Sequence, residues 1–228
     1  METGSDNFPV VFRAATASDR EDVRDALGRF FFPEEPITIS YYGGSEVTAD
    51  DMNNSLSLID DGFVTLAVDG NSDKIVGISA GSLIEPNEAE KLMDLASNAE
   101  TVKFADILHF LAHMVNQADI FQRLAVTKVY HIHSLAVAPE VRERSLGTLL
   151  VRKQFEQARQ CGAQAVSTDA TGVHSARIFK KLGMENVYSI SYEKYRNASH
   201  QQVFVGKEPH LEATTFAMLI GNRTEIDK

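Results

Sequence analysis

Two hydrophobic periods alternate along the chain, and this alternation limits the fold more than any other feature of the sequence. Short apolar runs typical of buried strands occur near residues 10–13, 63–69, 74–84, 129–137, 163–168, 187–192 and 214–220. Between them, apolar residues recur at helical spacing near residues 23–31, 52–59, 89–97, 102–117, 146–161 and 173–182. The pattern predicts a mixed α/β (α+β) fold in the order β-α-α-β-β-α-α-β-α-β-α-β-β.

Several residues are expected to mark helix ends. Ser18 and Glu21 have the spacing of a capping box ahead of the first helix, and Pro33 is expected to end that helix. Gly162 and Gly183 follow two later helical patterns and are expected as their C-caps.

Composition limits the class of protein and its partners. With 228 residues, 43% of them hydrophobic, and no repeats or long linkers, residues 1–228 are expected to form a single domain. The single cysteine, Cys161, cannot form a disulfide within the chain, which predicts a reducing, cytoplasmic location. No signal peptide or membrane span is expected. The net charge of -10 argues against nucleic-acid and anionic-membrane partners. We expect a monomer or weak dimer.

The segment LAVAPEVRERSLGTLL (135–150) leads from a strand into a helix and predicts a local anion site. A helix N-terminus carries unpaired N–H groups and a partial positive charge. Ser145 and Gly147 are small enough to leave the backbone accessible, and Arg142 and Arg144 add cationic donors that suit phosphate oxygens. A solvated, arginine-rich helix start is the alternative. The GxxxxGK and GxGxxG patterns are absent.

The same segment carries a family resemblance. VAPEVRERSLG (137–147) resembles the acyl-CoA pyrophosphate loop of the GCN5-related N-acetyltransferases (GNATs), with Ser145 where glycine is usual. Within that superfamily the chain resembles the insect-type arylalkylamine (dopamine-like) N-acetyltransferases. This likeness rests on FFFPEEP (30–36), HMVNQADIF (113–121), and SAR (175–177) followed by KLG (181–183).

The resemblance implies a fold, a reaction and a cosubstrate. The fold is a mixed central sheet of about seven strands, flanked by helices and splayed at the acyl-CoA site. The reaction is direct N-acetylation of a small primary amine in a ternary complex with acetyl-CoA, without a metal. Dopamine, serotonin or tyramine would be typical amines.

Acetyl transfer needs a neutral amine, a stabilised oxyanion and a protonated leaving thiol. The resemblance places the catalytic base on Glu35, for which a surface loop carboxylate is the alternative. It aligns Ser175 with a serine linked to catalysis, and Thr171 with a second such serine, although Thr171 suits a helix N-cap at least as well. Phe179 stands where many family members carry a tyrosine acid, so that role is unfilled.

Two sets of binding residues follow from the resemblance. The backbone of Leu135, Ala136 and Val137 is expected to hold the oxyanion and pair with the pantetheine arm, while their side chains are expected in the core. The residues expected to bind acetyl-CoA are Leu135, Ala136, Val137, Arg142, Glu143, Arg144, Ser145, Leu146, Gly147, Thr148, His174 and Lys180. Glu34, Pro36 and His210 are expected on the amine side, although a surface position is favoured for Glu34.

The substrate class stays open from the sequence alone. An aromatic pocket for an arylalkylamine is one possibility, built from residues 30–32, 41–42 and 114–121, which equally suit ordinary core. The early carboxylates Glu34, Glu46, Asp50 and Asp51 favour instead a second cationic end, as in agmatine or a polyamine. A catalytically weak acyl-CoA-binding protein is a third alternative, motivated by Ser145 and Phe179.

Two histidines raise the question of a metal site. His131 and His133 alternate along a strand and so face one side of it. Without a cysteine partner or an HExxH spacing, we expect hydrogen-bonded imidazoles there rather than metal ligands.

Overall fold

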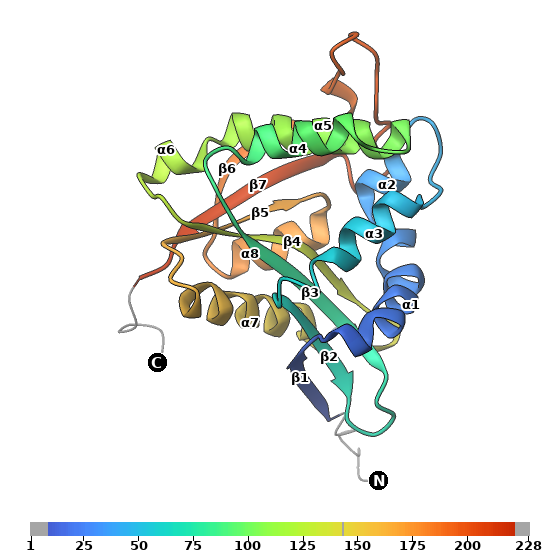
Figure 1. Ribbon diagram of the computed structural model, residues 1–228, viewed down its shortest axis with the longest axis vertical. Helices are drawn as coiled ribbons and strands as arrows, with labels where there is room; N and C mark the ends of the chain where they lie inside the picture. Colours follow the sequence, from blue (N-terminus) through green and yellow to red (C-terminus); the bar gives the residue numbers. More distant parts are fainter. Residues whose placement is uncertain (1–8, 143, 222–228) are drawn as a thin grey trace.

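The computed structural model describes residues 9–142 and 144–221. Over these residues the chain forms one mixed sheet of seven strands, in the order β1-β2-β3-β4-β5-β7-β6, flanked by helices (Figure 1). The strands are β1 (Val10–Ala14), β2 (Val64–Asp69), β3 (Ile75–Ile84), β4 (Val129–Val137), β5 (Ala165–Ala170), β6 (Glu185–Ser191) and β7 (Glu212–Leu219). The helices are α1 (Arg20–Phe30), α2 (Pro36–Ser40), α3 (Ala49–Ser57), α4 (Glu88–Ser97), α5 (Val102–Ala118), α6 (Ile120–Leu124), α7 (Leu146–Gln160) and α8 (Val173–Lys181). The predicted mixed α/β fold is confirmed.

One strand pair differs from the others. Strands β4 and β5 run parallel, whereas the other neighbours in the sheet are antiparallel. The parallel pairing joins Val129 to Ala165 and ends where Ile132 meets Thr168. Strand β4 continues to Val137 and stays paired with β3 there. The sheet therefore opens between the C-terminal ends of β4 and β5, which is the splay that the family resemblance implied.

The helices cover both faces of this sheet. Figure 1 shows α5 along one side and α7 and α8 along the other. In β4, Tyr130 and Ile132 pack in the cluster that includes Phe155 of α7, whereas Val129 packs against Ile120 of α6. Because side chains alternate along a strand, residues with odd numbers near the start of β4 face α5 and α6.

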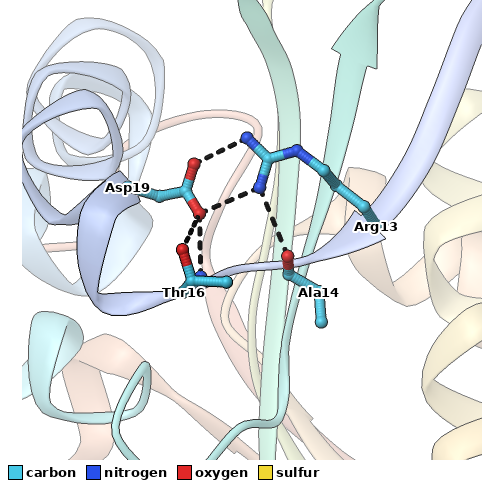
Figure 2. Close-up of polar contacts among 4 residues, drawn as sticks. All are labelled: Arg13, Ala14, Thr16 and Asp19. Carbon is cyan, nitrogen blue, oxygen red and sulfur yellow. Dashed lines mark hydrogen bonds and ion pairs between the residues drawn. The ribbon is translucent and has the colours of Figure 1, made fainter.

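The start of α1 differs from the sequence prediction. The capping box is formed by Thr16 and Asp19, two residues ahead of the predicted pair Ser18 and Glu21, at the short 3-10 turn that leads into α1. Figure 2 shows why: the Asp19 carboxylate accepts hydrogen bonds from Thr16 N and Oγ1, both 2.8 Å, and from both terminal nitrogens of Arg13. Asp19, bonded by Thr16 and by Arg13 on β1, therefore takes part in the cap in place of the predicted pair.

Other boundaries follow local signals with small differences. Gly162 and Gly183 have φ angles of 72° and 85°, as expected for C-caps, and α1 ends before Pro33. Helices α2 and α6 have five residues each, too few to show a hydrophobic period, and the sequence did not predict them. In the part of the chain that is described, no helix has the length and apolar character needed to span a membrane.

Candidate active site

The opening in the sheet leaves one edge of β4 unpaired. Residues 134–137 pair with β3 on one side, as far as the pair formed by Gly77 and Val137, and His133 falls at an irregularity in that pairing. On the other side, pairing with β5 stops at Ile132. An extended ligand can bind such an edge as an added strand. The expected pantetheine-binding segment 135–137 lies here, with the Ala136 side chain buried at 7% exposure.

The N-terminus of α7 faces this free edge. A Cβ atom on Gly147 would lie 2.9 Å from Ile178 Cδ1, 3.7 Å from Val137 Cγ2 and 3.9 Å from Leu135 Cδ2. The absence of a side chain therefore lets the first turn of α7 pack closely between α8 and β4. Its unpaired N–H groups begin beside the strand edge, where an anion is stabilised by the helix.

Ser145 precedes this turn in a left-handed conformation. It is the N-cap of α7, with φ 60° and ψ 14°. Glycine adopts this region without the steric cost that a Cβ atom brings, which explains physically why glycine suits this place. The rest of the predicted loop has mixed exposure: Arg142, Arg144 and Ser145 are exposed, Thr148 is half-buried, and Leu146 and Gly147 are buried. Glu143 lies outside the described residues.

Two consecutive glutamates contact the two arms of the opening. Glu34 Oε2 accepts a hydrogen bond from Arg142 Nη2 at 2.7 Å, and Arg142 Nε donates to the Val137 carbonyl at 3.1 Å. The side chains of Glu34 and Arg142 are 50% and 42% exposed. Glu34 is therefore on the surface, as its sequence position favours, but it is paired with the arginine that follows β4.

Glu35 contacts the other arm. It is the N-cap of α2, and its Oε2 accepts a hydrogen bond from Thr38 N at 2.7 Å. The Thr171 hydroxyl, directly after β5, hydrogen-bonds the same carboxylate. Burial raises the pKa of Glu35, while these hydrogen bonds oppose the rise. The residue as a whole is half-buried, and a carboxylate whose pKa is raised in this way suits a general base.

Three segments meet at Gly172. A Cβ atom there would lie 2.5 Å from His210 Nδ1 and 2.9 Å from Pro36 Cγ. Val173 N donates a hydrogen bond to His210 Nδ1 at 3.2 Å, which fixes the imidazole against the start of α8. The structure therefore brings Pro36 and His210, both predicted on the amine side, next to Glu35 and Thr171.

The remaining predicted residues lie along α8. Ser175 is half-buried, and its Oγ donates to the Gly172 carbonyl at 3.0 Å. The exposed His174 ring lies edge-on to His210, with 5.4 Å between centroids, so it lies beside a residue that was predicted on the amine side. Lys180 is exposed near the other end of the helix. Phe179 is buried at 2% exposure in the core.

The two strand histidines are hydrogen-bonded. His131 Nδ1 lies 2.9 Å from Ser167 Oγ, and His133 Nε2 lies 2.7 Å from Ser82 Oγ. Burial lowers the pKa of His131 to about 4, so this imidazole is neutral at physiological pH. Across residues 9–142 and 144–221, no group of three or more His, Cys, Asp or Glu residues is placed to hold a metal ion.

The predicted aromatic pocket is partly ordinary core. Phe30 and Phe32 are buried in the cluster beneath α1. Tyr41 donates its hydroxyl to Asp106 at 2.9 Å, and Tyr42 is 73% exposed. The helical segment 114–121 differs, because Val115, Asn116 and residues 119–121 line a cavity.

The early carboxylates mostly have partners within the chain. Asp50 accepts hydrogen bonds from Thr101 N and Oγ1, and Asp51 accepts from Thr48 N and Oγ1. Asp51 belongs to the capping box of α3, Asp50 bonds the N-cap residue of α5, and Glu34 is paired with an arginine. The expectation that these carboxylates receive a second cationic end of the substrate stays a prediction.

Two polar residues near the opening were missed from the sequence. Asp169 lies near the end of β5 with a side chain that is only 8% exposed. Tyr192 is fully buried and donates its hydroxyl to the Thr171 carbonyl. The available signal for Asp169 was an acidic residue inside an apolar strand, because aspartate is almost never fully buried without a partner.

Comparisons with known proteins agree with this geometry. The model of the acetyltransferase (GNAT) family matches residues 22–184. The structure of a mosquito arylalkylamine N-acetyltransferase like 5b is 36% identical, with a TM-score of 0.91 over 93% of this chain and 100% of that chain. A Drosophila melanogaster polyamine N-acetyltransferase that forms N-acetylagmatine is 29% identical, with a TM-score of 0.87; the match covers 93% of this chain and 100% of that chain. Arylalkylamine N-acetyltransferase 2 from Aedes aegypti is 25% identical, with a TM-score of 0.84; the match covers 93% of this chain and 99% of that chain.

The family match covers most of the chain and includes the loop before α7, the splayed strands and all of α8. The resemblance noted in the sequence is thereby confirmed. The chain belongs to the acetyltransferase (GNAT) family.

Proposed function

We propose that the protein transfers the acetyl group of acetyl-CoA to a small primary amine, with an arylalkylamine as the acceptor and Glu35 as the base. One observation carries this proposal. Glu34 and Glu35, adjacent in sequence, contact Arg142 beyond β4 and Thr171 beyond β5, so the loop that holds them spans the mouth of the opening. A carboxylate of raised pKa thus lies where an amine can meet a ligand bound along β4.

The residues at the opening fit acetyl-CoA. The free backbone edge at 135–137 suits the pantetheine arm, and the first turn of α7 with Arg142 and Arg144 suits the pyrophosphate. Ser145, Gly147 and Thr148 belong to that turn, and Lys180 on α8 completes the set proposed for the cosubstrate. Acetyl-CoA supplies the reactive thioester.

The chain's own groups then have distinct tasks. Glu35, through water, accepts the proton that the ammonium group must lose before attack. Backbone N–H groups of Leu135–Val137 stabilise the negative charge that develops on the carbonyl oxygen as the C–N bond forms. When the carbonyl re-forms, the C–S bond breaks and CoA leaves as the thiolate. Ser175 and Thr171 lie on the amine side of the opening, where we assign Thr171 to positioning Glu35 and Ser175 to proton transfer to the departing thiolate.

The amine class is supported by the 36%-identical arylalkylamine relative and by the cavity at the α5–α6 turn. The 29%-identical polyamine relative supports agmatine or a polyamine as the second candidate. The test is release of CoA thiol from acetyl-CoA with dopamine, serotonin, tyramine, agmatine, spermidine and a lysine peptide. We expect the fastest turnover with an aromatic amine.

The base assignment has its own variant. Glu35→Gln keeps a similar shape and should lower kcat by about 10²- to 10⁴-fold with the preferred amine. Glu185→Gln, an exposed change at the start of β6, is the matched control and should keep wild-type turnover. Full activity of Glu35→Gln contradicts the base assignment. Binding of acetyl-CoA without turnover of any amine contradicts the proposed reaction and favours a longer acyl donor or an acyl-CoA-binding protein.

A further inference from the structure

A cavity of about 150 Å³ lies between the sheet and the turn that joins α5 to α6. Ile84, Val115, Ile120 and Phe121 contribute apolar wall, and polar atoms of Asn116, Asp119 and Gln122 lie along the turn. An apolar cavity of about this volume holds one benzene-sized ring. The size therefore suits the ring of a single-ring arylalkylamine.

The sheet side of the cavity is polar and holds a buried carboxylate. Asp169, His131 and Thr215 line it there. The Asp169 side chain is 8% exposed, and its Oδ1 accepts a hydrogen bond of 2.6 Å from Thr215 Oγ1. An ionised carboxylate has about four acceptor positions. Burial raises the pKa of Asp169 to about 6, so at neutral pH the group is mostly ionised and acts only as an acceptor.

The spacing between Asp169 and His131 matches a bridging hydroxyl group. His131 Nε2 lies 3.8 Å from Asp169 Oδ2, which is too long for a direct hydrogen bond. A hydroxyl oxygen between them donates to the carboxylate and accepts from the ring N–H, because a hydroxyl does both. An ammonium group has donors only, so it satisfies the carboxylate but not an imidazole N–H.

The cavity is also at a suitable distance from the proposed base. Asp169 is two residues before Thr171, about 7 Å along an extended chain. Thr171 in turn bonds Glu35. Tyr192 lies near both carboxylates: its pKa is raised mainly by burial, and the charges of Glu35 and Asp169 raise it further. An aromatic ring with a two-carbon amine arm, measured from its ring hydroxyl to its amine, has a length comparable to this separation.

We propose that Asp169, together with His131, binds the ring hydroxyl of a hydroxylated arylalkylamine and so makes the enzyme select phenolic amines over amines with an unsubstituted ring. This inference rests on the proposed N-acetyltransferase function. Within that function, the inference assigns two residues to substrate specificity and names phenolic amines as the preferred chemical class. In the absence of the amine, water is expected to occupy the hydroxyl position.

The test compares three acceptors that differ at one ring position: tyramine, 4-methoxyphenethylamine and phenethylamine. The methoxy group accepts a hydrogen bond but cannot donate one. With the unmodified enzyme, kcat/KM for tyramine should exceed that for each of the other two by at least about tenfold. If all three are acetylated equally, the inference is overturned while the proposed function stands. If none is acetylated, both are overturned.

Two variants then locate the selectivity. Asp169→Asn should reduce the tyramine preference severalfold, and Asp169→Val should remove it, because an apolar side chain cannot accept the phenol hydrogen. Asp106→Asn is the matched control: its carboxylate binds the hydroxyl of Tyr41, away from the cavity, and the preference should be unchanged. A preference that survives Asp169→Val overturns the assignment. So does a wild-type preference for agmatine over tyramine that is lost in Asp169→Asn, which would identify a cation site.

Discussion

Arg142 and Glu34 are 108 residues apart in sequence and form an ion pair of 2.7 Å across the mouth of the opening between β4 and β5. In this pair, Glu34 occupies the guanidinium group of Arg142, which the sequence predicts to bind the CoA pyrophosphate. Because both side chains are about half exposed, the pair is expected to contribute at most about 1 kcal/mol. A pyrophosphate can therefore replace the carboxylate at little cost.

Removal of this competition should strengthen acetyl-CoA binding. We expect Glu34→Gln to lower KM for acetyl-CoA by about two- to fivefold, the equivalent of up to about 1 kcal/mol. Arg142→Gln should raise it roughly tenfold through loss of a charge-assisted contact. In the Arg142→Gln background, Glu34→Gln should have no further effect. Steady-state kinetics of the four proteins checks this, and an equal effect of Glu34→Gln in both backgrounds contradicts the competition.

The hydrogen bond from Thr171 to Glu35 should appear in the pH dependence of activity. A donor to the carboxylate favours its ionised form, so Thr171→Val, which keeps the shape but removes the hydroxyl, should raise the pKa of Glu35 further. Since the base acts only when ionised, the acidic limb of the kcat/KM profile should move to higher pH.

The pH–rate profiles of wild type and Thr171→Val provide the measurement. Thr127→Val is a matched control, because the Thr127 hydroxyl bonds Gln164 at a turn outside the opening. A limb that stays in place in Thr171→Val would mean that this limb reports another group.

The left-handed conformation of Ser145 should reduce stability. At φ 60° a glycine avoids the Cβ clash, so Ser145→Gly is expected to stabilise the fold by about 0.5–1 kcal/mol, after allowance for the greater chain entropy of glycine. For a domain of this size that corresponds to roughly 1–4 °C in Tm. Ser97→Gly, at the last residue of α4, is the control and should lower Tm. Thermal unfolding distinguishes the two, and a lower Tm for Ser145→Gly contradicts the strain argument.

The contact between Arg13 and Asp19 should make stability depend on pH. Bonds from Arg13 and Thr16 hold the pKa of Asp19 well below its usual range, although burial opposes this. The stabilisation is therefore complete above the unfolded-state pKa of about 3.9 and is lost as pH falls toward the folded-state value.

Asp19→Asn should cost about 2 kcal/mol in unfolding free energy at pH 7, with a smaller difference from wild type at pH 3. Asp22→Asn, an exposed change on the same helix, should cost little. Denaturant unfolding at the two pH values provides the check. A difference between wild type and Asp19→Asn that is independent of pH would contradict the ionic contribution.

Local patterns in the sequence determined the order of the strands and of the longer helices, the C-caps at Gly162 and Gly183, and the helix start after β4. These features depend on the spacing of apolar residues and on the backbone conformations that a few neighbouring residues favour, and both are encoded within a single segment. The family resemblance added Glu35 and its neighbours, and the structure places Glu35, Pro36, Thr171 and His210 together.

Only the tertiary structure decided the contacts between distant segments. Nothing in the local sequence pairs Glu34 with Arg142 or turns Asp169 and His131 toward one cavity. Such contacts depend on where the parallel pairing of β4 and β5 ends and on how close helices can pack, and these are properties of the assembled sheet. The substrate selectivity proposed here therefore comes from a cavity that four strands and two helices form only after folding.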